Sequence, residues 1–73
     1  MKLKDQDLTT LKDATELLKT NADLLEPTSR MASQANLALF SRLRKVVNAI
    51  LAKRRASYSE QGKPTDPRWE EIP

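Results

Sequence analysis

Apolar and small residues recur at helical spacing near the start of the chain. These positions are Leu8, Leu11, Ala14, Thr15, Leu18, Ala22 and Leu25. At about 100° per residue they cover one face of a helix, whereas no stretch shows the period-2 alternation of a strand. Asp7 is a suitable N-cap, and Pro27 disfavours helical geometry at Glu26. The pattern predicts a helix over about residues 8–25.

A second, longer helical pattern follows almost at once. Thr28 and Ser29 are both competent N-caps, Pro27 suits a first helical position, and no breaker appears before Gly62. We therefore predict one helix over about residues 29–59. Its expected packing face is Ala32, Ala35, Leu39, Phe40, Leu43, Val46, Val47, Ile50 and Leu51. Its expected solvent face is Arg30, Ser41, Arg44, Lys45, Asn48, Ala52 and Arg55.

The short connection at Pro27 makes the two helices antiparallel neighbours. The second helix is longer and is expected to overhang the first by about two turns. Leu17 and Leu24 add a second apolar strip on the nominal solvent side of the first helix. The predicted fold class is all-α: a two-helix antiparallel hairpin over residues 1–61 that dimerises into a four-helix bundle. The alternative is a monomeric hairpin whose own C-terminal tail covers the gap.

Residues 62–73 differ in composition from the rest of the chain. They contain three of the four prolines, which forbids a helix and predicts an irregular tail, extended or disordered. Trp69, next to Arg68, is a single large anchor on a proline-stiffened segment, which is typical of a short docking peptide. The alternatives are that Trp69 packs back onto the same molecule or that the tail is disordered.

Charge is segregated along the chain. Residues 1–27 carry a net charge of −2, residues 28–63 a net +7 and residues 64–73 a net −2. The basic face of the second helix contains Arg44, Lys45 and Arg55 and is extended by Lys53 and Arg54. Such a surface can bind phosphates, or its arginines can pair with the acids of the first helix. Because helix-turn-helix and RNP signatures are missing, we rank a protein partner above nucleic acid.

Composition limits the chemistry that this chain can perform. The 73 residues form one small domain without cysteine or histidine, so the usual disulfide, thiolate metal site and general base are missing. We expect no cofactor, no metal, no small-molecule substrate and no enzymatic activity. The start of the chain lacks a signal-peptide pattern, and no apolar run approaches the roughly 20 residues that span a bilayer. A cytoplasmic protein without a membrane role is expected.

The predicted function is a non-enzymatic protein–protein interaction module: a small regulator, adaptor or inhibitor that binds itself and another protein. The expected partner-binding residues are Trp69, Arg68, Leu17, Leu24, Arg44, Lys45 and Arg55. The alternative is a nucleic-acid-binding helical dimer that uses Arg44, Lys45, Lys53, Arg54 and Arg55. Steep weakening of binding by salt is typical of the second kind and separates the two.

Overall fold

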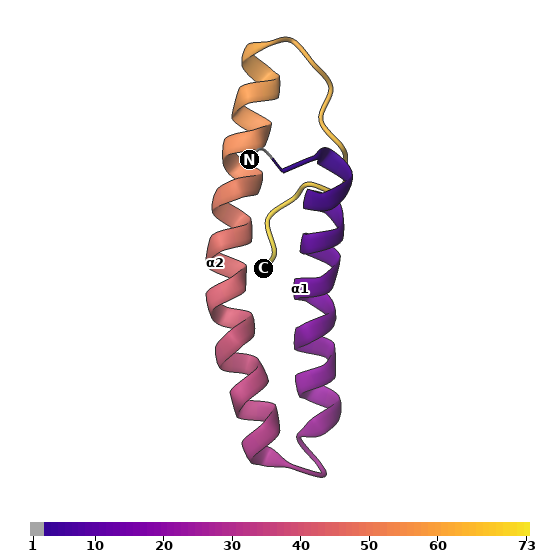
Figure 1. Ribbon diagram of the computed structural model, residues 1–73, viewed down its shortest axis with the longest axis vertical. Helices are drawn as coiled ribbons and strands as arrows, with labels where there is room; N and C mark the ends of the chain where they lie inside the picture. Colours follow the sequence, from indigo (N-terminus) through magenta and orange to yellow (C-terminus); the bar gives the residue numbers. More distant parts are fainter. Residues whose placement is uncertain (1–2) are drawn as a thin grey trace.

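The computed structural model describes residues 3–73 and contains two antiparallel helices joined by a short turn (Figure 1). Helix α1 spans Asp5–Leu25 and helix α2 spans Arg30–Glu60. The C-terminal segment returns from the end of α2 and lies between the two helices. No strand occurs in the described residues. The prediction of an all-helical hairpin is therefore confirmed.

The start of α1 differs from the prediction. The helix begins at Asp5, three residues earlier than expected, and Lys4 rather than Asp7 is its N-cap. Lys4 has an extended backbone and makes no capping hydrogen bond through its side chain. The extra turn is held from across the hairpin, because Arg54 donates to the Asp5 carboxylate at 2.6 Å and the Tyr58 hydroxyl also donates to it. The overhang of α2 is correspondingly shorter than predicted.

The turn between the helices depends on Ser29. Helix α1 ends at Leu25, and the N–H groups of Thr28 and Ser29 donate to the Leu25 carbonyl at 3.0 and 2.7 Å. Ser29 is the N-cap of α2, and its hydroxyl accepts from the Ala32 N–H at 3.3 Å. Pro27 lies in the turn, so its expected place at the first position of α2 is wrong.

Helix α2 ends in a Schellman motif at Gly62. The Gly62 N–H donates to the Ser59 carbonyl at 3.1 Å, and the Lys63 N–H donates to the Tyr58 carbonyl at 2.9 Å. Gly62 has a φ of 67°, in the left-handed region that glycine adopts without strain. The motif redirects the chain from the end of α2 towards the start of α1, as Figure 1 shows.

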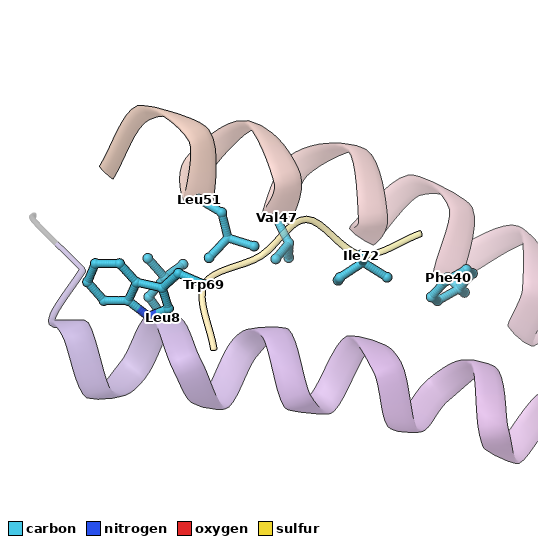
Figure 2. Packing of buried hydrophobic residues seen from close by; sticks show 6 residues of the cluster. All are labelled: Leu8, Phe40, Val47, Leu51, Trp69 and Ile72. Atoms are coloured by element: carbon cyan, nitrogen blue, oxygen red, sulfur yellow. The ribbon is translucent and has the colours of Figure 1, made fainter. Parts of the chain in front are cut away.

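The apolar core is shared by three segments of the chain. Its buried apolar residues are Leu8 from α1, Phe40, Val47 and Leu51 from α2, and Trp69 and Ile72 from the C-terminal segment (Figure 2). Trp69 is only 1% exposed and Ile72 only 5% exposed. In this structure the C-terminal segment is irregular and packs against both helices.

The packing face predicted for α2 is too broad. Phe40 and Val47 are buried, but Leu39 and Val46 remain 48% and 56% exposed. Each exposed residue stands one position before a buried one and so lies about 100° from it around the helix. Helix α1 alone does not cover so wide an arc. The C-terminal segment covers only the opposite flank of α2, where Asn48 lies, and leaves Leu39 and Val46 exposed.

Trp69→Ala is expected to lower the free energy of unfolding by about 3–5 kcal/mol, the usual effect of removing a large buried aromatic side chain. Urea denaturation followed by circular dichroism measures the change. Met31→Ala is the control, because Met31 is 84% exposed and its loss should change stability by less than about 0.5 kcal/mol. Equal effects of the two substitutions would contradict the burial of Trp69.

Candidate functional site

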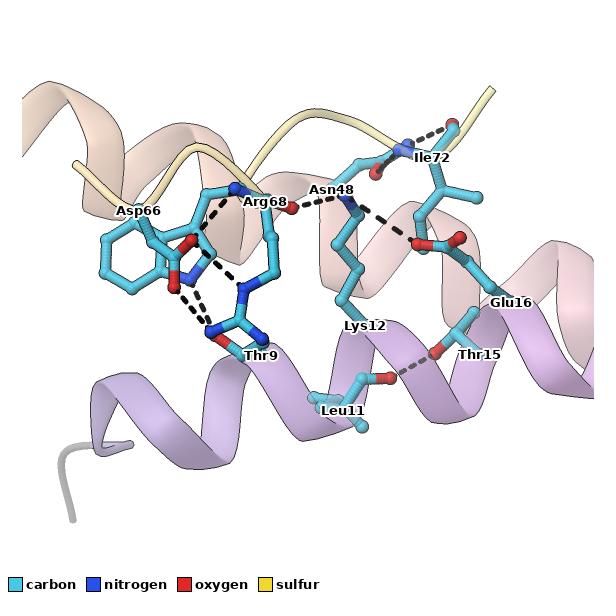
Figure 3. A network of polar contacts seen from close by, with 10 residues as sticks. Thr9, Leu11, Lys12, Thr15, Glu16, Asn48, Asp66, Arg68 and Ile72 are labelled. Atoms are coloured by element: carbon cyan, nitrogen blue, oxygen red, sulfur yellow. Dashed lines mark hydrogen bonds and ion pairs between the residues drawn. The ribbon is translucent and has the colours of Figure 1, made fainter.

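One groove runs between α1 and α2 on the flank where the C-terminal segment lies, and we call it the tail groove. From here on, we use the word tail for residues 66–73, which occupy this groove. We call residues 61–65, which connect α2 to the tail, the linker. The polar side chains that contact the tail are Thr9 and Lys12 from α1 and Arg44, Asn48 and Arg55 from α2. Figure 3 shows how Thr9, Lys12 and Asn48 point toward the tail from the two helices.

Trp69 occupies the tail groove beside the first turns of α1. Its indole Nε1 donates to Thr9 Oγ1 at 3.0 Å, and the Thr9 hydroxyl donates to the Asp5 carbonyl at 3.1 Å. The Tyr58 ring stands edge-on to the indole, with centroids 5.4 Å apart and an interplanar angle of 62°. A buried indole needs a partner for its N–H group, and Thr9 supplies it. Both the position and the orientation of Trp69 are thereby fixed.

Ile72 is held by the side-chain amide of Asn48. The Ile72 N–H donates to Asn48 Oδ1 at 2.7 Å, and Asn48 Nδ2 donates to the Ile72 carbonyl at 3.0 Å (Figure 3). One carboxamide thus pairs with both main-chain groups of a single residue, as a neighbouring strand does in a sheet. This contact holds the main chain of the tail, and the Ile72 side chain packs into the apolar core.

The tail enters the groove through a turn that begins at Asp66. The Asp66 carboxylate accepts from the Arg68 N–H at 2.9 Å and from its guanidinium at 3.0 Å, while the Trp69 N–H donates to the Asp66 carbonyl at 3.0 Å. Pro67 occupies the second position of this turn, where its fixed φ is favourable. Lys12 Nζ donates to the Arg68 carbonyl. The main chain just before Trp69 is therefore also bound.

Two carboxylates near the groove, those of Asp5 and Asp66, have a lowered pKa. The side-chain hydrogen bonds from Arg68, with its backbone N–H, hold the pKa of Asp66 below its ordinary value. The hydrogen bond from Tyr58 lowers the pKa of Asp5; desolvation opposes the shift and Arg54 adds to it. The same hydrogen bond raises the pKa of Tyr58. These exposed ionic contacts orient side chains more than they stabilise the fold.

The five basic residues that the sequence grouped on α2 do not form one free surface. Arg54 forms an ion pair with Asp5 at 2.6 Å, and Arg55 forms one with Glu71 at 3.4 Å. Arg44 donates to the last residue of the tail at 3.5 Å and lies over the ring of Phe40. The expected solvent face of α2 is therefore wrong in part, because the tail lies against it.

The remaining expected site residues are exposed. Lys45 and Lys53 face solvent and take part in none of the ion pairs formed within residues 3–73. Arg68 is also exposed and pairs with Asp66 in its own turn at 3.0 Å. Leu17 is 58% exposed on α1. Unlike these residues, Trp69 is buried and in this conformation is not available to a partner.

Four exposed apolar side chains lie away from the tail. They are Leu17 and Leu24 on α1, 58% and 71% exposed, and Leu39 and Val46 on α2, 48% and 56% exposed. Each of the four directly precedes a buried or half-buried residue in the sequence. Asn48, which holds the tail, instead directly follows the buried residue Val47. In an antiparallel helix pair, this order places the four on the side opposite the tail. We call this side the bare flank.

No protein-family model, no curated protein and no solved structure matches this chain. Neither helix in the described part of the chain is long and apolar enough to cross a lipid bilayer. Within residues 3–73, no group of three or more His, Cys, Asp or Glu side chains is placed to hold a metal ion. The function of the chain is therefore inferred from its own surfaces.

Of the residues that contact the tail, the sequence singled out Arg44 and Arg55 but not Thr9, Lys12 or Asn48. Thr9 and Lys12 read as ordinary polar positions of a helix, and Asn48 was placed on the solvent face with the basic residues. One usable signal was the Asp66-Pro67 pair, since an Asp before a proline favours a turn. A turn just before Trp69 indicates a fixed rather than a free anchor.

Asn48→Ala is expected to loosen the end of the tail while the hairpin stays folded, because two hydrogen bonds are lost at a partly buried site. Exchange of the Ile72 N–H hydrogen should become about 10- to 100-fold faster, as expected for a local loss of 1–3 kcal/mol. Amide exchange followed by NMR measures this rate. Ser41→Ala, on the exposed surface of the same helix, should leave the rate unchanged. An unaltered rate in Asn48→Ala would show that the amide does not hold Ile72.

Tyr58→Phe is expected to raise the pKa of Asp5 toward its ordinary value of 3.8, because the largest cause of the lowered pKa is removed. A lowered carboxyl pKa in the folded state stabilises the fold above pH 3.8 and is lost as the pH falls through the lowered value. The wild-type chain should therefore lose more stability on acidification than Tyr58→Phe. NMR titration of the Asp5 carboxyl carbon measures the shift, and identical titration curves would contradict the contact.

Proposed function

We propose that this chain is a non-enzymatic protein–protein interaction module that associates with a second copy of itself, and with other proteins, through the bare flank. One observation carries the proposal: the tail covers only one side of the hairpin. Trp69 and Ile72 close the tail groove, while Leu39 and Val46 on the other side stay 48% and 56% exposed. Leu39 and Val46 are seven residues apart and so lie on the same face of α2, and exposed apolar side chains that share one face are typical of interaction surfaces.

The charges of the two helices favour a second copy as a partner. Helix α1 carries five acids and two lysines, a net charge of −3, whereas α2 carries seven basic residues and one acid, a net +6. In a two-fold dimer through the bare flanks, α1 of one copy can pack against α2 of the other. Opposite charges then meet at the rim around an apolar centre.

Such a dimer is a four-helix bundle with the two tails on its outer sides. The apolar centre would contain Leu39 and Val46 from both copies, and Leu17 and Leu24 lie further round α1, toward the edge. These edge leucines remain for a further protein partner. A small regulator, adaptor or inhibitor in the cytoplasm, bound stoichiometrically to its target, fits this arrangement.

Nucleic acid is the second candidate partner, and a smaller surface supports it. Arg42, Lys45 and Lys53 are exposed on α2 and take part in none of the ion pairs formed within residues 3–73. The three arginines at positions 44, 54 and 55 are already engaged within the chain. Binding to nucleic acid should weaken steeply with salt and require Lys45 and Lys53, whereas binding through leucines should change little.

Leu39→Glu combined with Val46→Glu is expected to abolish self-association, because charges would have to be buried at the centre of the interface. Wild-type chain should sediment as a dimer at micromolar concentration, and its melting temperature should rise with concentration. The double variant should sediment as a monomer with unchanged helical circular dichroism.

Ser41→Glu combined with Ala52→Glu is the matched control, since it introduces the same charges at exposed positions of α2 away from the bare flank. This control should remain dimeric. A wild-type chain that sediments as a monomer throughout the micromolar range would contradict the proposal. A Leu39→Glu/Val46→Glu variant that still dimerises would also contradict it.

A further inference from the structure

We propose that the tail groove also accepts the tail of a second copy, so that two chains exchange tails and each completes the other's core. This inference concerns the side of the hairpin opposite the bare flank and does not depend on association there. The partner copy would contribute Trp69 and Ile72, the two side chains without which the core between α1 and α2 is incomplete.

Every contact that holds the tail joins it to the body of the hairpin and can be made by a tail from another chain. Lys12 and Thr9 on α1 bind the Arg68 carbonyl and the indole of Trp69. Asn48 on α2 binds both main-chain groups of Ile72. The linker takes part in none of these contacts, so an exchanged tail loses nothing in the groove.

Charge also favours this particular segment as the occupant. Residues 64–73 carry a net charge of −2, and the groove presents basic side chains to them. Arg55 pairs with Glu71 at 3.4 Å, and Arg44 donates to the end of the tail at 3.5 Å. The turn that begins at Asp66 is internal to the tail and travels with it.

The linker is attached to α2 and not to the groove. The N–H groups of Gln61, Gly62 and Lys63 all donate to carbonyls of the last turn of α2, between Ser57 and Ser59. The side chains of residues 61–65 are exposed. The backbone conformation at the end of α2 therefore directs the tail back to its own hairpin.

Gly62 is the residue on which this return depends. Its φ of 67° lies in the region that other L-residues rarely adopt, and β-branched residues least of all. A Cβ added at Gly62 would have no atom within 4 Å, so a substitution there acts through the backbone and not through a collision. A residue that resists this conformation disfavours the return but leaves the groove and the tail intact. In a variant with such a residue at position 62, the tail is free to bind the groove of a second copy.

The first test compares Gly62→Val with Gly62→Asn, because asparagine tolerates a positive φ and valine does not. Both are made in the Leu39→Glu/Val46→Glu background, which removes association through the bare flank. Sedimentation equilibrium should give a dimer dissociation constant at least about tenfold lower for Gly62→Val than for Gly62→Asn. Adding Trp69→Ala should return the valine variant to a monomer. Equal dissociation constants, or a dimer that survives Trp69→Ala, would overturn the proposal.

The second test mixes two complementary full-length chains in the same background. One carries Asn48→Ala with Thr9→Ala and keeps an intact tail, whereas the other carries Trp69→Ala and keeps an intact groove. Only the first contains tryptophan, so its fluorescence should become protected from acrylamide on mixing, as a one-to-one complex forms. If Trp69→Ala alone does not fold, mixing should restore helical circular dichroism. A mixture that behaves as the sum of its components overturns the proposal.

Discussion

The seating of the Trp69 indole between the two helices is the interaction on which the rest of the structure depends. Two amphipathic helices in a hairpin can bury only one line of contact, and ordering each residue costs about 1–2 kcal/mol of backbone entropy. Trp69 is 1% exposed and, with Ile72, adds apolar burial that the helices do not supply to each other. Thr9 satisfies the indole N–H, so that burying this polar group leaves no unpaired donor.

The position of the tail makes the two sides of the hairpin unequal. On one side Asn48 and the neighbouring arginines hold the tail, and their charges and hydrogen bonds are used within the chain. On the other side Leu39 and Val46 stay exposed. The asymmetry directs the proposed association to the bare flank, and it also reduces the basic surface that a phosphate backbone could contact.

Much of the architecture follows from local sequence signals. The seven apolar or small positions of α1, the break at Pro27, the cap at Ser29 and the stop at Gly62 set the helices and their antiparallel order. The first turn of α1 was missed because it is held by Arg54 and Tyr58, which are distant in sequence. The roles of Thr9 and Asn48 were missed for the same reason: their partners lie 60 and 24 residues away. The periodicity of apolar residues predicts which face of a helix is buried. It does not predict which other segment of the chain covers that face.

The central claim, that the tail is part of the core, can be measured on the unmodified chain because Trp69 is its only tryptophan. Acrylamide quenching of the indole fluorescence should be weak under native conditions and strong in concentrated urea, since the buried ring is accessible only after unfolding. Quenching that is equally strong in both conditions would place Trp69 in solvent. The tail would then be no part of the core, and the hairpin would have two open flanks.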